Sequence, residues 1–142
     1  MGVKVKVEIR DGVKHMNFEQ VTCMLSKAFW SPGIKIDEVK QGAENSSLVV
    51  GAFCDNVQVG FARVISDKTR FAYIADVYVD ENYRRHGIAK EMMHFILSHE
   101  LLKDVYQWYL VSAARELYEK VGFTDLSEPE KWMEIRQSRP ER

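Results

Sequence analysis

The spacing of hydrophobic residues changes near the start of the chain. Over residues 3–9, valine and isoleucine alternate with charged side chains, and this period of two predicts a half-buried strand closed by Asp11-Gly12. Over residues 17–30 the apolar side chains recur at helical spacing instead. Asn17 is a predicted N-cap, and Gln20 stands three residues later, as in a capping box. The sequence therefore predicts a strand followed by a helix.

Three strand-like segments occupy the middle of the chain, after a second short helix predicted at residues 36–43. They cover residues 47–54, 57–65 and 71–79, and short turn signals separate them. Parallel neighbours need a crossover of about a dozen residues or more, which these turns are too short to supply. We therefore expect an antiparallel meander.

Helices and extended segments alternate in the last third of the chain. Residues 87–102 carry a helical apolar face. The other elements expected here are a strand at 106–111, a helix at 113–121, an extended segment from Phe123 and a last strand at 132–135. This order predicts an α/β or α+β layered domain with a mixed sheet. The length of 142 residues is that of one ordinary domain, so we expect a single domain over residues 1–142.

Charge and composition limit what this domain binds. The formal net charge is -1, which gives no general attraction to nucleic acid or to an anionic membrane. No apolar run approaches the roughly 20 residues of a membrane span, and no signal-peptide core is visible, so we expect a cytoplasmic protein. Cys23 and Cys54 lack the paired spacing of a zinc site. We expect both to be buried free thiols, and we expect no metal.

The most informative segment follows the third strand of the meander, where a turn opens a helix. The first amides of a helix have no partner inside it, and the helix dipole favours an anion in front of them. Gly87 and Ala89 leave room for a pyrophosphate, while Arg84 and Arg85 add charged donors. The predicted phosphate-binding residues are Arg84, Arg85, His86, Gly87, Ile88, Ala89 and Lys90, with His86 expected to face solvent. A surface loop with a glycine at a helix start is the alternative.

Two motifs together resemble a known family. Arg84-Arg85-His86-Gly87-Ile88-Ala89 resembles the CoA-binding signature [QR]-x-x-G-x-[GA] of the GNAT superfamily of N-acetyltransferases. Leu117-Tyr118-Glu119-Lys120-Val121-Gly122-Phe123 resembles its L-Y-x-x-x-G-F landmark, and one helix and one strand lie between the two, as in the family. The chain is most similar to a subgroup of small bacterial-type GNAT proteins of unknown substrate. Residues 59–64, 71–77 and 132–135 extend the likeness over most of the chain.

The resemblance implies a fold, a co-substrate and several roles. It implies the GNAT acyl-CoA N-acyltransferase fold, with a mixed, mostly antiparallel central sheet flanked by helices, and acetyl-CoA as co-substrate. The backbone of Val77, Tyr78 and Val79 is then expected to lie along the pantetheine arm. A neutral amine attacks the thioester directly and CoA leaves as a thiolate. Tyr118 is placed to protonate that thiolate or to hydrogen-bond its developing charge.

The acceptor side is less defined. Asp76 is the nearest acidic candidate for a general base, with a turn-stabilising carboxylate as the alternative and water as another proton acceptor. Trp30, Tyr73 and Trp108 are candidates for a substrate pocket, although such residues are more often plain core residues. Val111 stands where the family often has Asn or Thr, and the family's glutamate base falls near Phe71, where no carboxylate exists.

Two functions from different classes remain open. The first is an N-acetyltransferase acting on a primary amine of a small molecule or a peptide. The second is a non-catalytic CoA-binding or protein-interaction module on the same fold, since a fold does not fix an activity. A nucleic-acid binder that uses Arg84 and Arg85 is a weaker third possibility, because no basic stripe continues from them. A monomer and a homodimer are both compatible with the sequence.

Overall fold

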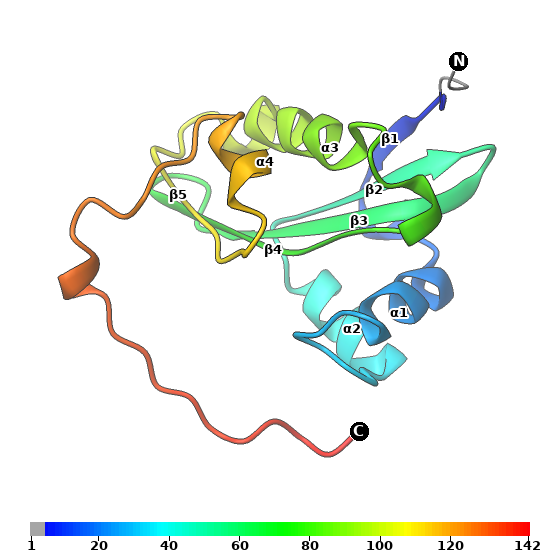
Figure 1. The fold of residues 1–142 in the computed structure, drawn as a ribbon, viewed down its shortest axis with the longest axis horizontal. Coiled ribbons are helices and arrows are strands. Elements are labelled where there is room, and N and C mark those ends of the chain that lie inside the picture. Colours follow the sequence, from blue (N-terminus) through cyan, green and yellow to red (C-terminus); the bar gives the residue numbers. More distant parts are fainter. Residues whose placement is uncertain (1–4) are drawn as a thin grey trace.

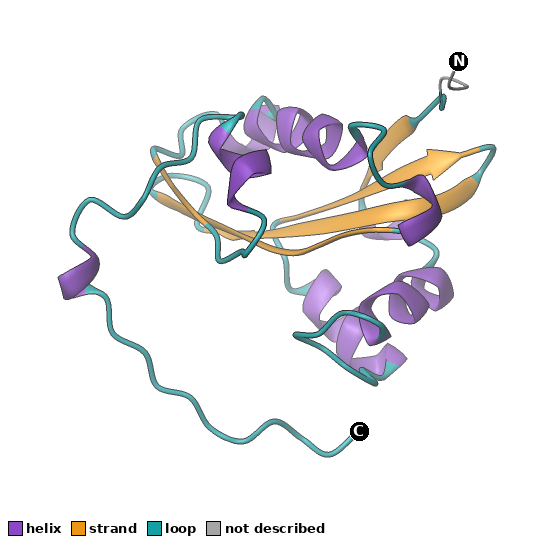
Figure 2. Ribbon diagram, in the orientation of Figure 1, coloured by secondary structure: helices purple, strands orange, loops and turns teal. Residues whose placement is uncertain are grey.

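A single mixed sheet organises the chain in the computed structural model, which describes residues 5–142 (Figure 2). Its strands follow one another in space in the order β1 (Glu8–Asp11), β2 (Leu48–Cys54), β3 (Val57–Ser66), β4 (Phe71–Val79) and β5 (Gln107–Tyr109). β1 to β4 pair antiparallel, and β5 joins β4 in parallel. The predicted meander and the mixed, mostly antiparallel sheet are confirmed.

Helices cover both faces of the sheet (Figure 1). α1 (Phe18–Ser26) and α2 (Ile36–Glu44) pack on one face, while α3 (Ile88–Leu97) and α4 (Arg115–Glu119) lie on the other. Each face has its own apolar cluster, one built with α1 and α2 and one with α3. The sheet therefore separates two layers, and a residue's place along a strand decides which layer its side chain enters.

The start of α1 is fixed by one local hydrogen bond and by one bond to a residue distant in the sequence. The Asn17 side chain accepts a hydrogen bond from the Gln20 amide at 3.1 Å, so the predicted N-cap is confirmed. The Asn17 amide donates to Oε1 of Gln58 at 2.8 Å, in place of the Gln20 side chain that a capping box would use. Gln58 is buried on β3, so this bond fixes the start of α1 to the sheet.

Several predicted boundaries and environments are wrong. β1 begins at Glu8, and Val3 lies outside the described residues. α1 ends at Ser26 instead of Trp30, and α3 ends at Leu97 instead of Leu102. Cys23 is exposed, because α1 turns Val21, Met24 and Leu25 toward the core, whereas Cys54 is buried as expected.

The strand predicted at residues 132–135 does not form. The segment is extended but unpaired, and Met133 and Ile135 expose 95% and 90% of their surface. β5 is only 3 residues long, so its outer edge gives a further strand few backbone partners. The chain instead leaves the body after α4 and loops round toward α1 and α2 (Figure 1).

Gly51 lies where β2 has no room for a side chain. A Cβ there would come within 2.7 Å of Nε2 of Gln58 and 2.8 Å of the Phe53 ring. We expect Gly51→Ala to lower the free energy of unfolding by about 1–3 kcal/mol through overpacking. Denaturant unfolding measures this. The matched control is Gly42→Ala, where the nearest neighbour is 3.7 Å away in a helix, so stability should stay or rise. Equal stability for the two variants would contradict the packing described.

Candidate cofactor and active site

β4 and β5 diverge after a short paired stretch. Their parallel pairing covers only Phe71–Tyr73 with Gln107–Tyr109. From Ile74 to Val79, β4 has no strand partner on that side among the described residues. Unpaired strand edges present a row of N–H and C=O groups, which an extended ligand can pair with. The diverging strands therefore leave an unpaired edge at residues 74–79, with which an extended ligand that carries amide groups can pair.

A β-bulge at Asp76 adjusts this edge. Asp76 has a positive φ of 56°, and the register with β3 passes from Arg63↔Ala75 to Phe61↔Tyr78. The extra residue changes which side chains face which layer. Val77 and Val79 pack against the cluster under α3, while Tyr78 packs against the cluster under α1.

The turn between β4 and α3 forms an open anion site. Gly87 has a φ of 77° and is the N-cap of α3, with no side-chain hydrogen bond capping the helix. The first helical bond is Glu91 N–H to Gly87 C=O, so the amides of residues 88–90 have no acceptor inside the helix. A Cβ on Gly87 would meet nothing within 4 Å. This combination of free amides and open space fits the diphosphate of CoA.

The charged residues of the turn are held to different degrees. Nε of Arg84 donates to the Val79 carbonyl at 2.9 Å, and its guanidinium carbon lies 5.2 Å from the centre of the Tyr78 ring. Arg84 therefore ties the turn to the end of β4. Arg85, His86 and Lys90 are exposed around the same turn. Ile88 instead buries its side chain in the core and so anchors the first turn of α3.

Tyr118 is buried on α4, in the cluster that also contains Ile88 and Met92 of α3. Only 6% of its surface is exposed. Burial raises the pKa of Tyr118, and a hydrogen bond with the Ser112 side chain opposes part of that rise. The phenol therefore keeps its proton throughout the neutral pH range and is available as a donor. Val77 and Val79 pack against the same cluster, so the ring belongs to the layer that borders the open edge of β4.

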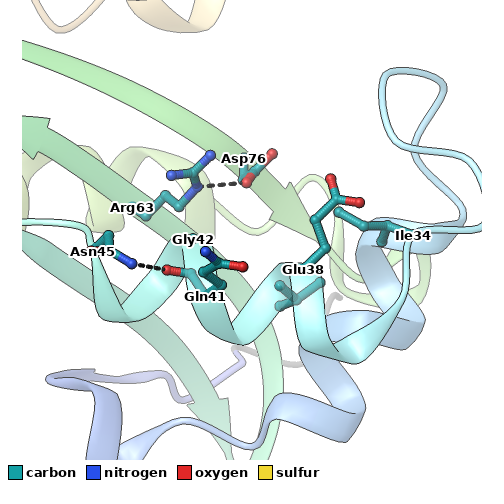
Figure 3. A pocket seen from close by; sticks show the side chains of 8 residues that line it. Ile34, Glu38, Gln41, Gly42, Asn45, Arg63 and Asp76 are labelled. Atoms are coloured by element: carbon teal, nitrogen blue, oxygen red, sulfur yellow. Dashed lines mark hydrogen bonds and ion pairs between the residues drawn. The ribbon is translucent and has the colours of Figure 1, made fainter. Parts of the chain in front are cut away.

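The carboxylate of Asp76 accepts hydrogen bonds from two side chains, one on β3 and one in the loop after α1. Nε of Arg63 donates to its Oδ2 at 2.7 Å (Figure 3). Nε1 of Trp30 donates to its Oδ1 at 3.1 Å. The side chains of Arg63 and Asp76 are both about four-fifths buried, at 23% and 18% exposed. A carboxylate that accepts from a guanidinium and an indole stabilises their positions. Its contacts favour the structural alternative for Asp76 over the role of a base.

The three aromatic residues predicted to line the acceptor pocket do not gather together. Trp30 lies edge-on to Tyr78, with ring centres 6.4 Å apart, on the α1 side of the sheet. Trp108 packs against the cluster on the α3 side. Tyr73 pairs with Ile65 and Tyr109 in the sheet, ahead of the bulge. The structure thus places Trp30 beside Asp76 and sets Trp108 in the opposite layer.

A cavity of about 390 Å³ opens between α2 and the strands β3 and β4 (Figure 3). Its lining residues are Ile34, Glu38, Val39, Gln41, Gly42, Asn45, Arg63 and Asp76. Glu38 and Arg63 are not among the site residues predicted from the sequence. A signal for Arg63 existed, since it is a lone charge inside the apolar run of β3, and a buried charge needs a partner.

No group of three or more histidine, cysteine, aspartate or glutamate side chains within residues 5–142 is arranged to hold a metal ion. None of the helices in this part of the chain combines the length and the apolar character needed to span a membrane.

The chain is similar to known acetyltransferases over most of its length. A family model described as an acetyltransferase (GNAT) domain matches residues 45–125. A protein of Xanthomonas campestris pv. campestris, described as belonging to the GNAT family, is 33% identical, with 93% of this chain and 94% of that chain covered and a TM-score of 0.85. No curated protein matches.

Two more distant structures share the fold. A GNAT-family acetyltransferase of Streptococcus pneumoniae is 22% identical, covers 95% of this chain and 100% of its own, and has a TM-score of 0.74. A predicted acetyltransferase of Clostridium acetobutylicum with acetyl-CoA is 19% identical, with 92% and 96% covered and a TM-score of 0.70.

Proposed function

This chain belongs to the GNAT family of acetyltransferases, and we propose that it transfers an acetyl group from acetyl-CoA to a primary amine as a single domain over residues 1–142. The observation that carries this proposal is the continuity between two features. The open edge of β4 leads, through the turn at residues 80–87, to the uncapped first turn of α3. An extended ligand along that edge ends with its phosphates at the free amides.

The binding residues each have a physical task in this proposal. When bound, acetyl-CoA supplies an acyl group activated as a thioester. The backbone of Val77 and Val79 pairs with the amides of the pantetheine arm, as a strand would. The amides of residues 88–90 hold the diphosphate, and Arg84, Arg85 and Lys90 add positive charge beside it. His86 is exposed at the outer side of the turn, where it remains a candidate contact.

Tyr118 and Asp76 have different roles in the chemical step. Tyr118 donates its proton, or a hydrogen bond, to the sulfur of the departing thiol. The cavity beside α2, lined by Arg63 and Asp76, receives the acceptor amine in this proposal and is called the acceptor cavity. Asp76 holds Arg63 and Trp30 in place, and a water molecule takes the proton from the amine. Tyr73 lies earlier on β4, before the bulge at Asp76. Trp108 packs in the layer that contains Tyr118.

A non-catalytic CoA-binding module on the same fold is the second candidate. The observation that favours it is the engagement of Asp76, because the carboxylate nearest to the cavity already accepts from Arg63 and Trp30. On this alternative the acetyl-CoA site is intact, and no amine is acetylated.

One assay separates the two functions. Acetyl-CoA is mixed with a panel of primary amines that includes alkylamines, diamines and lysine-containing peptides, and free CoA thiol is measured. We expect thiol release that depends on both an amine and the protein. Calorimetry with acetyl-CoA runs in parallel. Binding of acetyl-CoA without release of thiol for any amine would favour the non-catalytic module, and neither binding nor release would contradict both.

A further inference from the structure

The C-terminal segment carries regularly spaced positive charge. Arg136, Arg139 and Arg142 recur at every third position in the last seven residues. The segment has no helix or strand, and its residues are exposed except Arg142, which is partly buried. Figure 1 shows it looping round the molecule until its end lies near α1 and α2. Some contact must therefore select this position for the end of the chain.

Arg142 makes the principal contact. Its Nη2 lies 2.6 Å from Oε2 of Glu38 and its Nε lies 3.3 Å from Oε1. The guanidinium and the carboxylate therefore form a bidentate ion pair. The Arg142 side chain is only 11% exposed, whereas that of Arg136 in the same segment is 84% exposed. The Cβ of Arg142 would lie 3.6 Å from a Cβ on Gly33, in the loop between α1 and α2.

The second contact is made at Trp30, in the loop after α1. Nη1 of Arg139 donates to the backbone carbonyl of Trp30 at 2.8 Å. Trp30 is the residue whose indole donates to Asp76. Arg142 therefore contacts the cavity directly, through its lining residue Glu38, whereas Arg139 is connected to it through Trp30 and Asp76.

Charge balance shows why Glu38 attracts a cation. Figure 3 shows the carboxylates of Glu38 and Asp76 at one cavity, from α2 and from β4. Arg63 neutralises Asp76 at 2.7 Å. Within residues 5–142, Arg142 is the only side chain whose ion pair neutralises Glu38. If the C-terminal segment moves away, one negative charge remains without a partner at the rim of the cavity.

We infer that the Glu38 rim of this cavity is a subsite for a guanidinium or ammonium group, and that residues 136–142 occupy it as an internal competitor of a cationic acceptor. The acceptor class that this implies is an amine with a second positive charge at the far end of the molecule. That part rests on the proposed acetyl transfer. The occupation of the subsite by Arg142 does not depend on it.

The test uses small amines of known charge as probes. Calorimetry compares 1,4-diaminobutane, which has two charges, with 1-aminobutane, which has one. The double variant Arg139→Ala/Arg142→Ala is expected to bind the diamine about five-fold more tightly than the unaltered chain, the factor that corresponds to an ion pair of about 1 kcal/mol. Arg136→Ala is the control within the same segment: it removes one positive charge, against two in the double variant, at a residue whose ion pair within residues 5–142 is with Glu134 and not with the cavity.

A second substitution locates the subsite. Glu38→Gln in the double-variant background is expected to remove the added diamine affinity and to leave the monoamine unaffected. A double variant no tighter than Arg136→Ala, or a gain that survives Glu38→Gln, would overturn the inference. Failure of acetyl transfer would look different, because no amine would release CoA thiol while the diamine still bound as described.

Discussion

Gly87→Val is expected to lower the affinity for acetyl-CoA by about 100-fold or more. The new side chain projects into the open space in front of the amides of residues 88–90. It displaces the diphosphate from at least two charge-assisted hydrogen bonds, each contributing about 1.5–3 kcal/mol. Calorimetry with acetyl-CoA measures the loss, and the unfolding curve of the variant shows whether the domain still folds.

Gly122→Val is the matched control for the backbone. Gly122 also has a positive φ, 108°, and a Cβ there also meets nothing within 4 Å. Valine at either position carries strain of about 1–3 kcal/mol in the left-handed region. The control therefore reproduces the strain at a position outside the phosphate site, and acetyl-CoA should bind it nearly as well as the unaltered chain. Equal affinity for Gly87→Val and Gly122→Val would show that the diphosphate does not lie at the start of α3.

Tyr118→Phe is expected to lower kcat by about 100-fold, the lower end of what a positioned acid contributes, while the Kd of acetyl-CoA changes little. The substitution keeps the ring in the core and removes only the hydroxyl. Since burial raises the pKa of Tyr118, its acid form persists to higher pH than that of a free tyrosine, so the unaltered enzyme should not lose activity through this group as pH rises from 7 to 9. Thiol release across that pH range measures both statements.

Tyr109→Phe provides the comparison. Tyr109 is a partly buried tyrosine of β5 whose hydroxyl donates to Gln107, and it lies in the stretch where β4 and β5 are paired. Its loss should leave kcat close to that of the unaltered chain. A Tyr118→Phe enzyme with undiminished kcat would remove the phenol from the chemical step, and another donor would have to serve the thiolate.

The fold follows from the sequence where the signals are local. The alternation along β2 to β4 and their short turns predicted the meander, and the Asn17 cap lies within three residues of its partner amide. The strand expected at residues 132–135 did not form, because a strand exists only when another strand pairs with it, and that partner is decided elsewhere in the chain. The prediction that Cys23 is buried was wrong for a similar reason, since its apolar neighbours belong to the other face of α1.

The candidate site divides in the same way. The turn at residues 84–90 is contiguous, so its glycine, its amides and its positive charges could be selected from the sequence together. The separation of Trp30 from Trp108 depends on which face of the sheet each residue occupies, and no local pattern gives that. Arg63 meets Asp76 across two strands, and Arg142 meets Glu38 across more than 100 residues of chain, so neither pair has a signature in its own neighbourhood.

Hydrogen exchange of the backbone amides, with and without saturating acetyl-CoA, tests most directly whether β4 and α3 together form the acetyl-CoA site. Pairing along the open edge of β4 and contact at the start of α3 predict slower exchange at residues 74–79 and 87–90, with little change in β1 and β2. The same protection is predicted to be absent from the 87–90 segment of Gly87→Val. Bound acetyl-CoA that leaves both segments exchanging at their original rates would contradict the site described.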